Sequence, residues 1–184
     1  GSPVVVRNTG SGSVPVPVQD TSPPDLTVPG PVTVEAIGPQ TTVTIGIATA
    51  TDIVDTDVTV TNDAPTTFPV GTTTVTWKAT DDNANFSEKT QDVTVVDSTT
   101  PVLSGLSDIS PLEATSTDGA VANFTVTASD LVDGAVGVSC TPSSGSFFGL
   151  GVNNVNCSAA DVAGNTGSGS FTVTVQDTTP PVFT

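Results

Sequence analysis

The chain has 184 residues and a formal net charge of −16, from 19 acidic and 3 basic residues. Nucleic acid and anionic lipid are therefore poor partners, because phosphate binding needs clustered lysine and arginine. The sequence has no histidine and only two cysteines, which argues against a zinc site and a Ser-His-Asp triad. It has no run of about eighteen apolar residues, which argues against membrane insertion.

The first predicted element is a strand within residues 1–20, where "NTGSGSVPVPVQD" nearly copies residues 165–177. It resembles the last strand of a partial repeat, as a cut through a longer array would leave, or a donor strand for a neighbouring chain. Pro15 and Pro17 lack a backbone N–H, so this strand can pair fully along only one edge. The residues predicted to mediate assembly in this way are Val14, Val16 and Val18.

Two internal repeats follow this segment. "FPVGTTTVTWKATD" from Phe68 aligns with "FGLGVNNVNCSAAD" from Phe148 at a spacing of 80 residues. "ATDIVD" from Ala50 aligns with "ASDLVD" from Ala128 at a spacing of 78 residues. Such self-similarity indicates tandem domains. We predict one domain over residues 21–97, a second over 98–177, and a tail or the start of a following repeat over 178–184.

Alternating apolar and polar residues, rich in valine and threonine, predict short strands in both repeats. In the first repeat they cover residues 26–28, 32–36, 42–50, 57–62, 66–70, 73–80 and 90–96. In the second they cover residues 121–129, 135–140, 154–159 and 170–175. This pattern predicts an all-β chain of two tandem immunoglobulin-like or fibronectin-like β-sandwiches, each of about seven strands, with an extra N-terminal strand. A closed barrel is the minor alternative.

The two cysteines, Cys140 and Cys157, fall on predicted neighbouring strands, where a cross-strand disulfide is geometrically allowed. A secreted chain would pair them, whereas a cytosolic chain would keep them as buried thiols. A bridge would close a loop of about sixteen residues and stabilise the fold by about 3 kcal/mol. The first repeat has Asn62 and Trp77 at these positions, and Trp77 is best explained as a core aromatic.

Acidic residues recur in loops that should meet at one end of each sandwich, where the chain also enters the domain. Three or four carboxylates there would suit an interdomain calcium ion, which takes six to eight oxygen ligands. The predicted ligands are Asp20, Asp52, Asp55 and Asp81 in the first repeat and Asp97, Asp130, Asp133 and Asp161 in the second. The competing interpretation is that these aspartates only cap their own turns by accepting backbone N–H bonds.

The segments "QDTSPPD", "TVEA", "TATDIVD", "FPVGTTTVTWKATD", "TASDLVDGAV", "ADVAGNT" and "QDTTPPV", in this order along the chain, resemble the hyalin repeat (HYR) module over nearly the whole chain. The second repeat is the closer match, because the first lacks the cysteines and has "DDNAN" where "DVAGN" is typical. The resemblance implies an extracellular immunoglobulin-like module, usually in tandem and without catalysis. It also supports pairing of Cys140 with Cys157.

These observations predict a non-catalytic structural or adhesive repeat that acts as a stiff spacer in a cell-surface or matrix protein. Its expected partners are other repeats of the same protein, copies of itself, or a cell-surface or matrix protein, and calcium is the one cofactor expected. Two alternatives stay open: a filament subunit assembled by strand exchange or strand addition through the N-terminal segment, and a spacer beside a catalytic domain elsewhere. The unusual composition, poor in lysine and arginine, points to a bacterial or archaeal cell surface.

Overall fold

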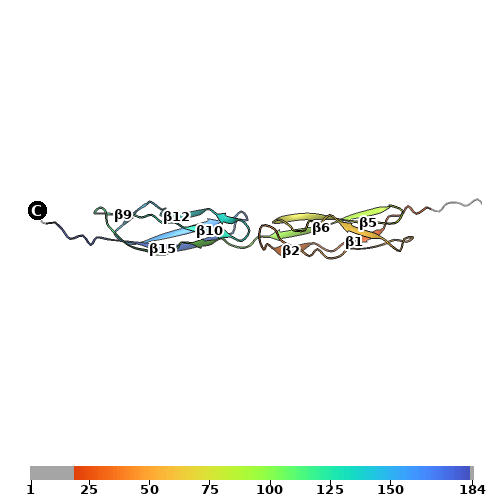
Figure 1. Cartoon of the computed structure of the whole chain (residues 1–184), viewed down its shortest axis with the longest axis horizontal. Helices are drawn as coiled ribbons and strands as arrows, with labels where there is room; N and C mark the ends of the chain where they lie inside the picture. The colour runs from red at the N-terminus through yellow and green to blue at the C-terminus, as the bar shows by residue number, and fades with distance from the viewer. Residues whose placement is uncertain (1–18, 183–184) are drawn as a thin grey trace, which may run out of the picture.

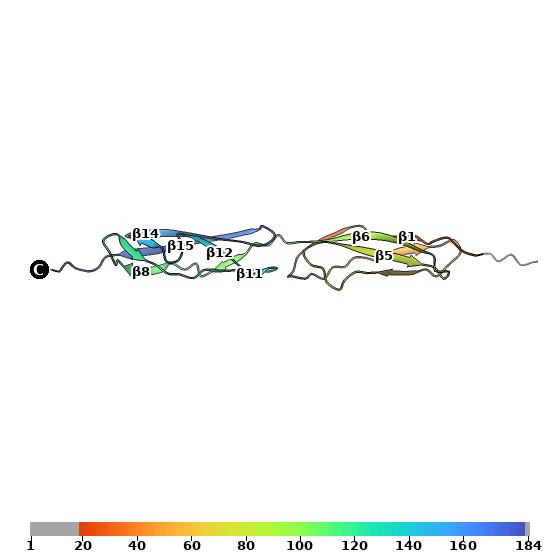
Figure 2. The same ribbon diagram turned by 90° about the horizontal axis from the view of Figure 1, so that it is seen from above.

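The computed structural model describes residues 19–182, which form an all-β structure, as predicted. Two elongated sandwiches lie end to end along the long axis of the molecule (Figures 1 and 2). We call the sandwich that contains β1 to β6 the first domain and the one that contains β7 to β15 the second domain. Within the described residues, no helix is long and apolar enough to cross a membrane. Val14, Val16 and Val18 lie outside these residues.

The first domain has two layers. A sheet in the order β2-β6-β5-β4 faces the pair β1-β3, and β2 runs parallel to β6. The strands are β1 (Asp25–Thr27), β2 (Val32–Glu35), β3 (Thr49–Thr51), β4 (Thr59–Asn62), β5 (Gly71–Thr80) and β6 (Phe86–Val96).

The second domain repeats this plan with a larger number of strands. Its main sheet has the order β12-β14-β15-β8, with β8 parallel to β15, and β11-β10-β7 and β13-β9 form smaller sheets. The strands are β7 (Val102–Ser104), β8 (Ile109–Glu113), β9 (Gly119–Val121), β10 (Thr127–Asp130), β11 (Gly134–Val136), β12 (Val138–Thr141), β13 (Phe147–Gly149), β14 (Gly151–Ala160) and β15 (Thr166–Gln176).

A long hairpin forms the backbone of each core. In β5, Val75, Trp77 and Ala79 alternate with polar residues, and all three are buried. Val93 and Val95 of β6 are buried beside them. Because side chains alternate between the faces of a strand, this pattern directs one apolar row into the core. Complete burial of one valine side chain contributes about 1.5–3 kcal/mol, so the hairpin supplies much of the stability of each domain.

The strands predicted over residues 42–50 and 121–129 are wrong in their middle parts. Within 42–50 only the C-terminal end forms a strand, and within 121–129 only the two ends do. In the remaining parts, a side chain takes the place of a neighbouring strand. In the first domain, Gln91 Nε2 donates to the carbonyl of Ile45 at 2.9 Å. In the second, Ser144 Oγ accepts from Phe124 N at 2.9 Å and donates to Phe124 O at 2.8 Å.

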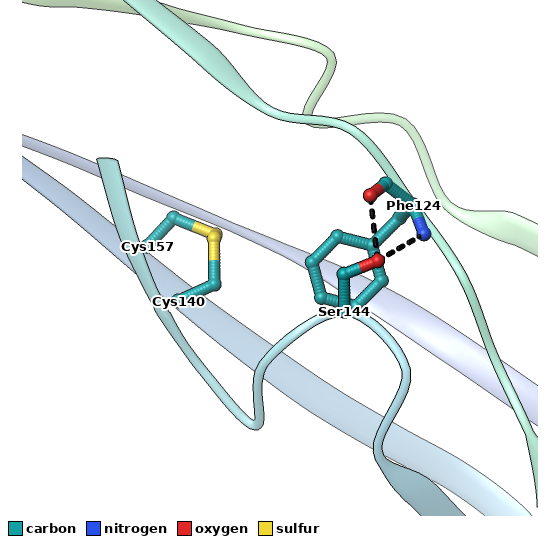
Figure 3. The surroundings of a disulfide bond; sticks show 4 residues. All are labelled: Phe124, Cys140, Ser144 and Cys157. Atoms are coloured by element: carbon teal, nitrogen blue, oxygen red, sulfur yellow. Dashed lines mark hydrogen bonds between the residues drawn. A yellow bond between two sulfur atoms is a disulfide. The ribbon is translucent and has the colours of Figure 1, made fainter. Parts of the chain in front are cut away.

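Cys140 of β12 lies directly opposite Cys157 of β14, and the two form a disulfide (Figure 3). This confirms the pairing that the HYR resemblance implies. Figure 3 also shows the two hydrogen bonds of Ser144 to the backbone of Phe124. The Phe124 ring packs edge to face on Phe171, with centroids 4.9 Å apart, so this corner of the second domain is held both covalently and by aromatic packing.

Candidate metal sites

Three carboxylates meet at the N-terminal end of the first domain. Asp20 precedes β1, Asp55 lies in the loop after β3, and Asp81 follows β5 directly. Each offers one oxygen, and these oxygens lie within 4.8 Å of one another. We call these residues the first acidic cluster. Oδ2 of Asp20 is buried and has no hydrogen-bond partner, which leaves a desolvated anionic oxygen in the cluster.

Asp52, the fourth residue predicted for this site, lies outside the first acidic cluster. Its Oδ1 accepts the backbone N–H groups of Val54 at 2.8 Å and Asp55 at 3.2 Å. These bonds form a turn cap that fixes the loop after β3. Asp52 therefore positions the backbone of Asp55 instead of contributing an oxygen to the cluster.

The second acidic cluster lies at the junction of the two domains and contains all four residues predicted for it. Their oxygens also lie within 4.8 Å of one another. Asp97 comes from the linker after β6 and Asp130 ends β10, while Asp133 and Asp161 come from the following loops. The members are Asp97, Asp130, Asp133 and Asp161. Four carboxylates from three segments thus converge: the linker, the turn that ends β10 and the loop after β14.

Turn capping accompanies this clustering in both domains. Asp161 accepts from Asn165 through the backbone N–H at 2.7 Å and the side-chain amide at 2.9 Å. The same amide donates to the carbonyl of Asp97 at 3.1 Å, so Asn165 fastens the linker to the loop after β14. In the first domain, Asn85 makes the equivalent contacts to Asp81 and to the carbonyl of Asp20. Asp81 and Asp161 therefore each cap a turn and also belong to an acidic cluster.

A hydroxyl two residues after the linker aspartate completes each site, and the sequence interpretation missed it. Thr99 donates to Asp97 Oδ1 through both its hydroxyl, at 2.7 Å, and its backbone N–H, at 3.1 Å. Ser22 holds Asp20 in the same way. The recurrence of Asp-Thr/Ser-Ser/Thr before a proline in "QDTSPP", "VDSTTP" and "QDTTPP" could have identified it.

The electrostatics of the first acidic cluster reflect its crowding. Burial raises the pKa of Asp55, and the nearby charges of Asp82, Asp81 and Asp20 raise it further. In contrast, the Ser22 hydroxyl and backbone N–H lower the pKa of Asp20. The two lysines of the described residues form ion pairs with Glu88 and Asp25, so neither neutralises a cluster.

In the second acidic cluster, the Asp130 side chain is buried, with 8 % of its surface exposed. The backbone N–H of Val132, at 2.7 Å from Oδ1, lowers the pKa of Asp130 and keeps it charged. Asp97 and Asp161 are equally inaccessible. The cluster therefore concentrates negative charge in a partly desolvated position, where a cation would relieve the repulsion.

The donor sets fit calcium. Carboxylates from several loops are its preferred protein ligands, and its coordination number of six to eight leaves room for carbonyls and water. The second cluster offers four carboxylates, and the first offers three with one oxygen unpaired. Bound there, the ion would supply the positive charge that the carboxylates lack.

Comparisons with known proteins identify the domains. The HYR domain family profile matches residues 19–95 and 96–175. Hyalin from Lytechinus variegatus is 36% identical over 185 residues, which cover 94% of this chain and 35% of that protein. Hyalin from Strongylocentrotus purpuratus is 39% identical over 121 residues, which cover 62% of this chain and 10% of that protein. The chain thus spans about a third and a tenth of the lengths of these relatives.

Solved structures that resemble the chain include fragments of cadherins and protocadherins. The EC1-2 fragment of human protocadherin-24 has a TM-score of 0.39 and 16% identity, and the match covers 85% of this chain and 100% of that one. Drosophila N-cadherin EC1-4 has a TM-score of 0.42 and 14% identity, with 85% and 50% covered.

The sequence relatives come from sea urchins, which contradicts the expectation of a bacterial or archaeal source. That expectation depended on amino-acid composition alone, and composition reflects charge and solubility more than lineage. The family profile covers nearly all of the described residues, in the order and with the spacing of the two repeats. The chain belongs to the HYR domain family and contains two HYR domains in tandem.

Proposed function

We propose that this chain is a non-catalytic extracellular structural and adhesive repeat that acts as a stiff spacer, with calcium bound at the two acidic clusters. The observation that carries the proposal is the second acidic cluster, because it includes Asp97 of the linker itself. An ion bound there would hold the linker to two segments of the second domain, the turn that ends β10 and the loop after β14. Bending at the junction would then require ligands to separate from the ion.

The extracellular location is supported by the disulfide between Cys140 and Cys157. Disulfides persist in oxidising compartments and are rare in the cytosol. The proposed partners are other repeats of the same protein, copies of this chain, or a cell-surface or matrix protein. The elongated form supports a spacer, because the two sandwiches lie end to end (Figure 1).

Thermal unfolding with calcium and then with a chelator tests the calcium part of the proposal. A ligand that binds only the folded state stabilises it by about 2.7 kcal/mol per site at a concentration one hundred times its dissociation constant. The unfolding midpoint should therefore rise with calcium and fall with chelator. An unchanged midpoint, together with no bound metal in elemental analysis, would exclude calcium.

A matched pair of variants assigns the effect to the second acidic cluster. Asp133→Asn removes one charged ligand but keeps an acceptor for the backbone N–H of Val162, which lies 2.8 Å from Asp133 Oδ2. Asp118→Asn removes the same charge at an exposed position outside both clusters. Only Asp133→Asn should weaken the calcium response. Equal weakening by both variants would indicate a general effect of net charge.

Small-angle X-ray scattering of the whole chain tests stiffness. A stiff spacer should scatter as a single rod whose maximum dimension is well defined in calcium. A broad range of dimensions in calcium would contradict the spacer role. Long uniform fibres in electron micrographs would instead favour the filament subunit, whose predicted pairing residues lie outside the described structure.

A further inference from the structure

The joint between the domains has two contacts besides the acidic cluster. Val132, in the loop after β10 of the second domain, packs against the apolar cluster of the first domain. Glu35, at the end of β2, accepts hydrogen bonds from Ser98 of the linker through the backbone N–H at 2.8 Å and the hydroxyl at 3.0 Å. One contact is apolar and covers the end of the first domain. The other fixes the direction in which the chain leaves it.

The loop of the first domain that corresponds to the Val132 loop makes the same backbone contacts, but no second domain covers it within residues 19–182. Val54 lies 78 residues before Val132, and its N–H donates to Asp52 Oδ1 at 2.8 Å, as the N–H of Val132 donates to Asp130 Oδ1 at 2.7 Å. Yet the side chain of Val54 is 61% exposed. The difference in burial comes from the neighbouring domain, because the local backbone contacts are the same.

The opposite end of the second domain is more exposed than the equivalent end of the first domain. Ala36 follows β2 in the first domain, and its N–H donates to Val96 O at 2.7 Å. Ala114 follows β8, and its N–H donates to Gln176 O at 2.8 Å. Ala36, at the joint, is 2% exposed, whereas Ala114 is only half-buried. We call the end of a domain at which the chain leaves it the base. The base of the second domain has the same backbone contact as the base of the first, but no domain packs on it within the described residues.

Glu113 holds the chain that leaves the second domain, as Glu35 holds the linker. These hydrogen bonds form although no further domain follows in the described residues. Glu113 accepts from Thr178 through the backbone N–H at 2.8 Å and the hydroxyl at 2.7 Å. It also accepts from the hydroxyl of Thr179 at 2.8 Å. The exit direction of the chain is therefore fixed within each domain. A base organised in advance loses less entropy when another domain docks on it.

We propose that the loop tip carrying Val54 is a docking surface for the base of another HYR domain in the same polypeptide. The base marked by Glu113 and Ala114 is, in turn, the surface that receives an equivalent loop. In the joint between the two domains, the loop carrying Val132 packs on the base of the first domain, so each of these two surfaces covers the other. The sequence of residues 8–20 agrees with this occupant, because it nearly copies residues 165–177, the closing strand of an HYR domain. The inference deepens the proposed spacer function and rests on it.

A duplicated chain tests this inference. Residues 1–177 of one copy are followed directly by residues 21–184 of a second, so that Asp177 takes the place of Asp20 and a new joint forms between the copies. Spin labels are placed on exposed strand residues, at Ser139 of the first copy and Thr90 of the second. A narrow distance distribution, as narrow as that between Thr90 and Ser139 across the existing joint, is expected.

The same substitution in each copy provides the matched control. Val54→Asp in the second copy places a charge in the new joint, and the narrow distribution should be lost. Val54→Asp in the first copy lies at the outer end and should leave the distribution unchanged. In the single chain, Val54→Asp should leave the unfolding midpoint of the first domain in place, which excludes misfolding as the cause.

The outcomes separate this inference from the spacer proposal. A broad distribution across the new joint, or a narrow one that survives Val54→Asp in the second copy, overturns the inference. If the existing joint is narrow in the single chain while the new one is broad, the spacer proposal stands and the inference fails. If the existing joint is itself broad, the spacer proposal fails first. Val132→Asp in the single chain should broaden the existing joint.

Discussion

The two domains share one scaffold but secure its centre by different chemistry. Asn62 and Trp77 face each other across β4 and β5, in the register at which Cys140 and Cys157 face each other across β12 and β14. The first domain therefore has a large aromatic residue where the second has half of a disulfide. In both domains the hairpin is tied to elements outside it, in the second directly by the disulfide to β12 and in the first through Gln91, which Trp77 contacts.

In the first domain the tie is a hydrogen-bond network. Trp77 Nε1 donates to Gln91 Oε1 at 3.0 Å, and Gln91 Nε2 donates to the carbonyls of Gly30 at 2.8 Å and Ile45 at 2.9 Å. Gln91 is 3% exposed; its bond with Trp77 is buried, and its two bonds to backbone carbonyls are partly buried. A fully satisfied buried network is rigid, but each member leaves costly unpaired groups when it is removed.

In the second domain, Phe171 occupies the position of Gln91 and packs on Phe124. The covalent bond of Cys140 to Cys157 replaces the polar network, so the centre needs no buried side-chain amide. A disulfide and a buried amide network can thus serve the same position in this fold. They should fail under different conditions: the disulfide under reduction, and the network after loss of a single polar group.

The largest effect is expected for Gln91→Leu. The change removes partners from Trp77 Nε1 and from the carbonyls of Gly30 and Ile45, and each buried unpaired group costs about 1–3 kcal/mol. We expect the first domain to lose about 4 kcal/mol of unfolding free energy. Trp77 is the only tryptophan, so its fluorescence during urea unfolding reports this domain alone. Phe171→Leu, the control at the equivalent position, should barely move the Trp77 midpoint, whereas no shift with Gln91→Leu would mean that the network contributes no stability.

Removal of the disulfide should have the next largest effect. The bridge joins residues separated by 17 positions, and a loop of that size corresponds to about 3 kcal/mol. The double variant Cys140→Ala with Cys157→Ala should therefore lower the stability of the second domain by that amount. Circular dichroism would show this loss, while the Trp77 fluorescence transition stays close to its original midpoint. An equal shift of both transitions would contradict the separate roles of the two centres.

Substitutions in the turns after β5 and β14 should change the free energy of unfolding by a smaller amount, with opposite signs in the two domains. Ala84 has a φ of 67°, and at the equivalent turn position of the second domain Gly164 has a φ of 92°. A residue with a Cβ pays a steric cost in this left-handed region. Ala84→Gly should stabilise the first domain by about 1 kcal/mol, and Gly164→Ala should destabilise the second by about as much. Equal signs for the two changes would contradict this explanation.

The smallest effect is expected for the pH dependence of the two acidic clusters in chelator. The folded-state pKa of Asp55 is raised, so its contribution is unfavourable once the pH exceeds that pKa, and Asp55→Asn should slightly raise the midpoint of the first domain at pH 7. The folded-state pKa of Asp130 is lowered, so it stabilises the second domain above its ordinary range and loses this effect as the pH falls through the lowered value. Asp130→Asn should therefore lower the midpoint at pH 7. Both differences should vanish at strongly acidic pH, and persistence there would exclude titration as the cause.

Much of the architecture follows from local periodicity. Alternation through Val75, Trp77 and Ala79 predicts β5 and its buried face, because the side-chain period of a strand is two residues. The predicted sandwich places the two cysteines on neighbouring strands, where they can face each other. The recurrence of aspartates in equivalent loops predicts that they gather at one end of each domain, although Asp52 lies outside the cluster.

Only the tertiary structure decided where backbone groups find partners from distant segments. Residues 42–48 alternate like a strand, yet Ile45 pairs with the side chain of Gln91, because a long-range hydrogen bond does not depend on local pattern. Likewise, the sequence gives Val54 and Val132 equivalent places in equivalent loops. Their different burial follows from the neighbouring domain alone, because burial depends on what packs against a side chain and not on its own segment.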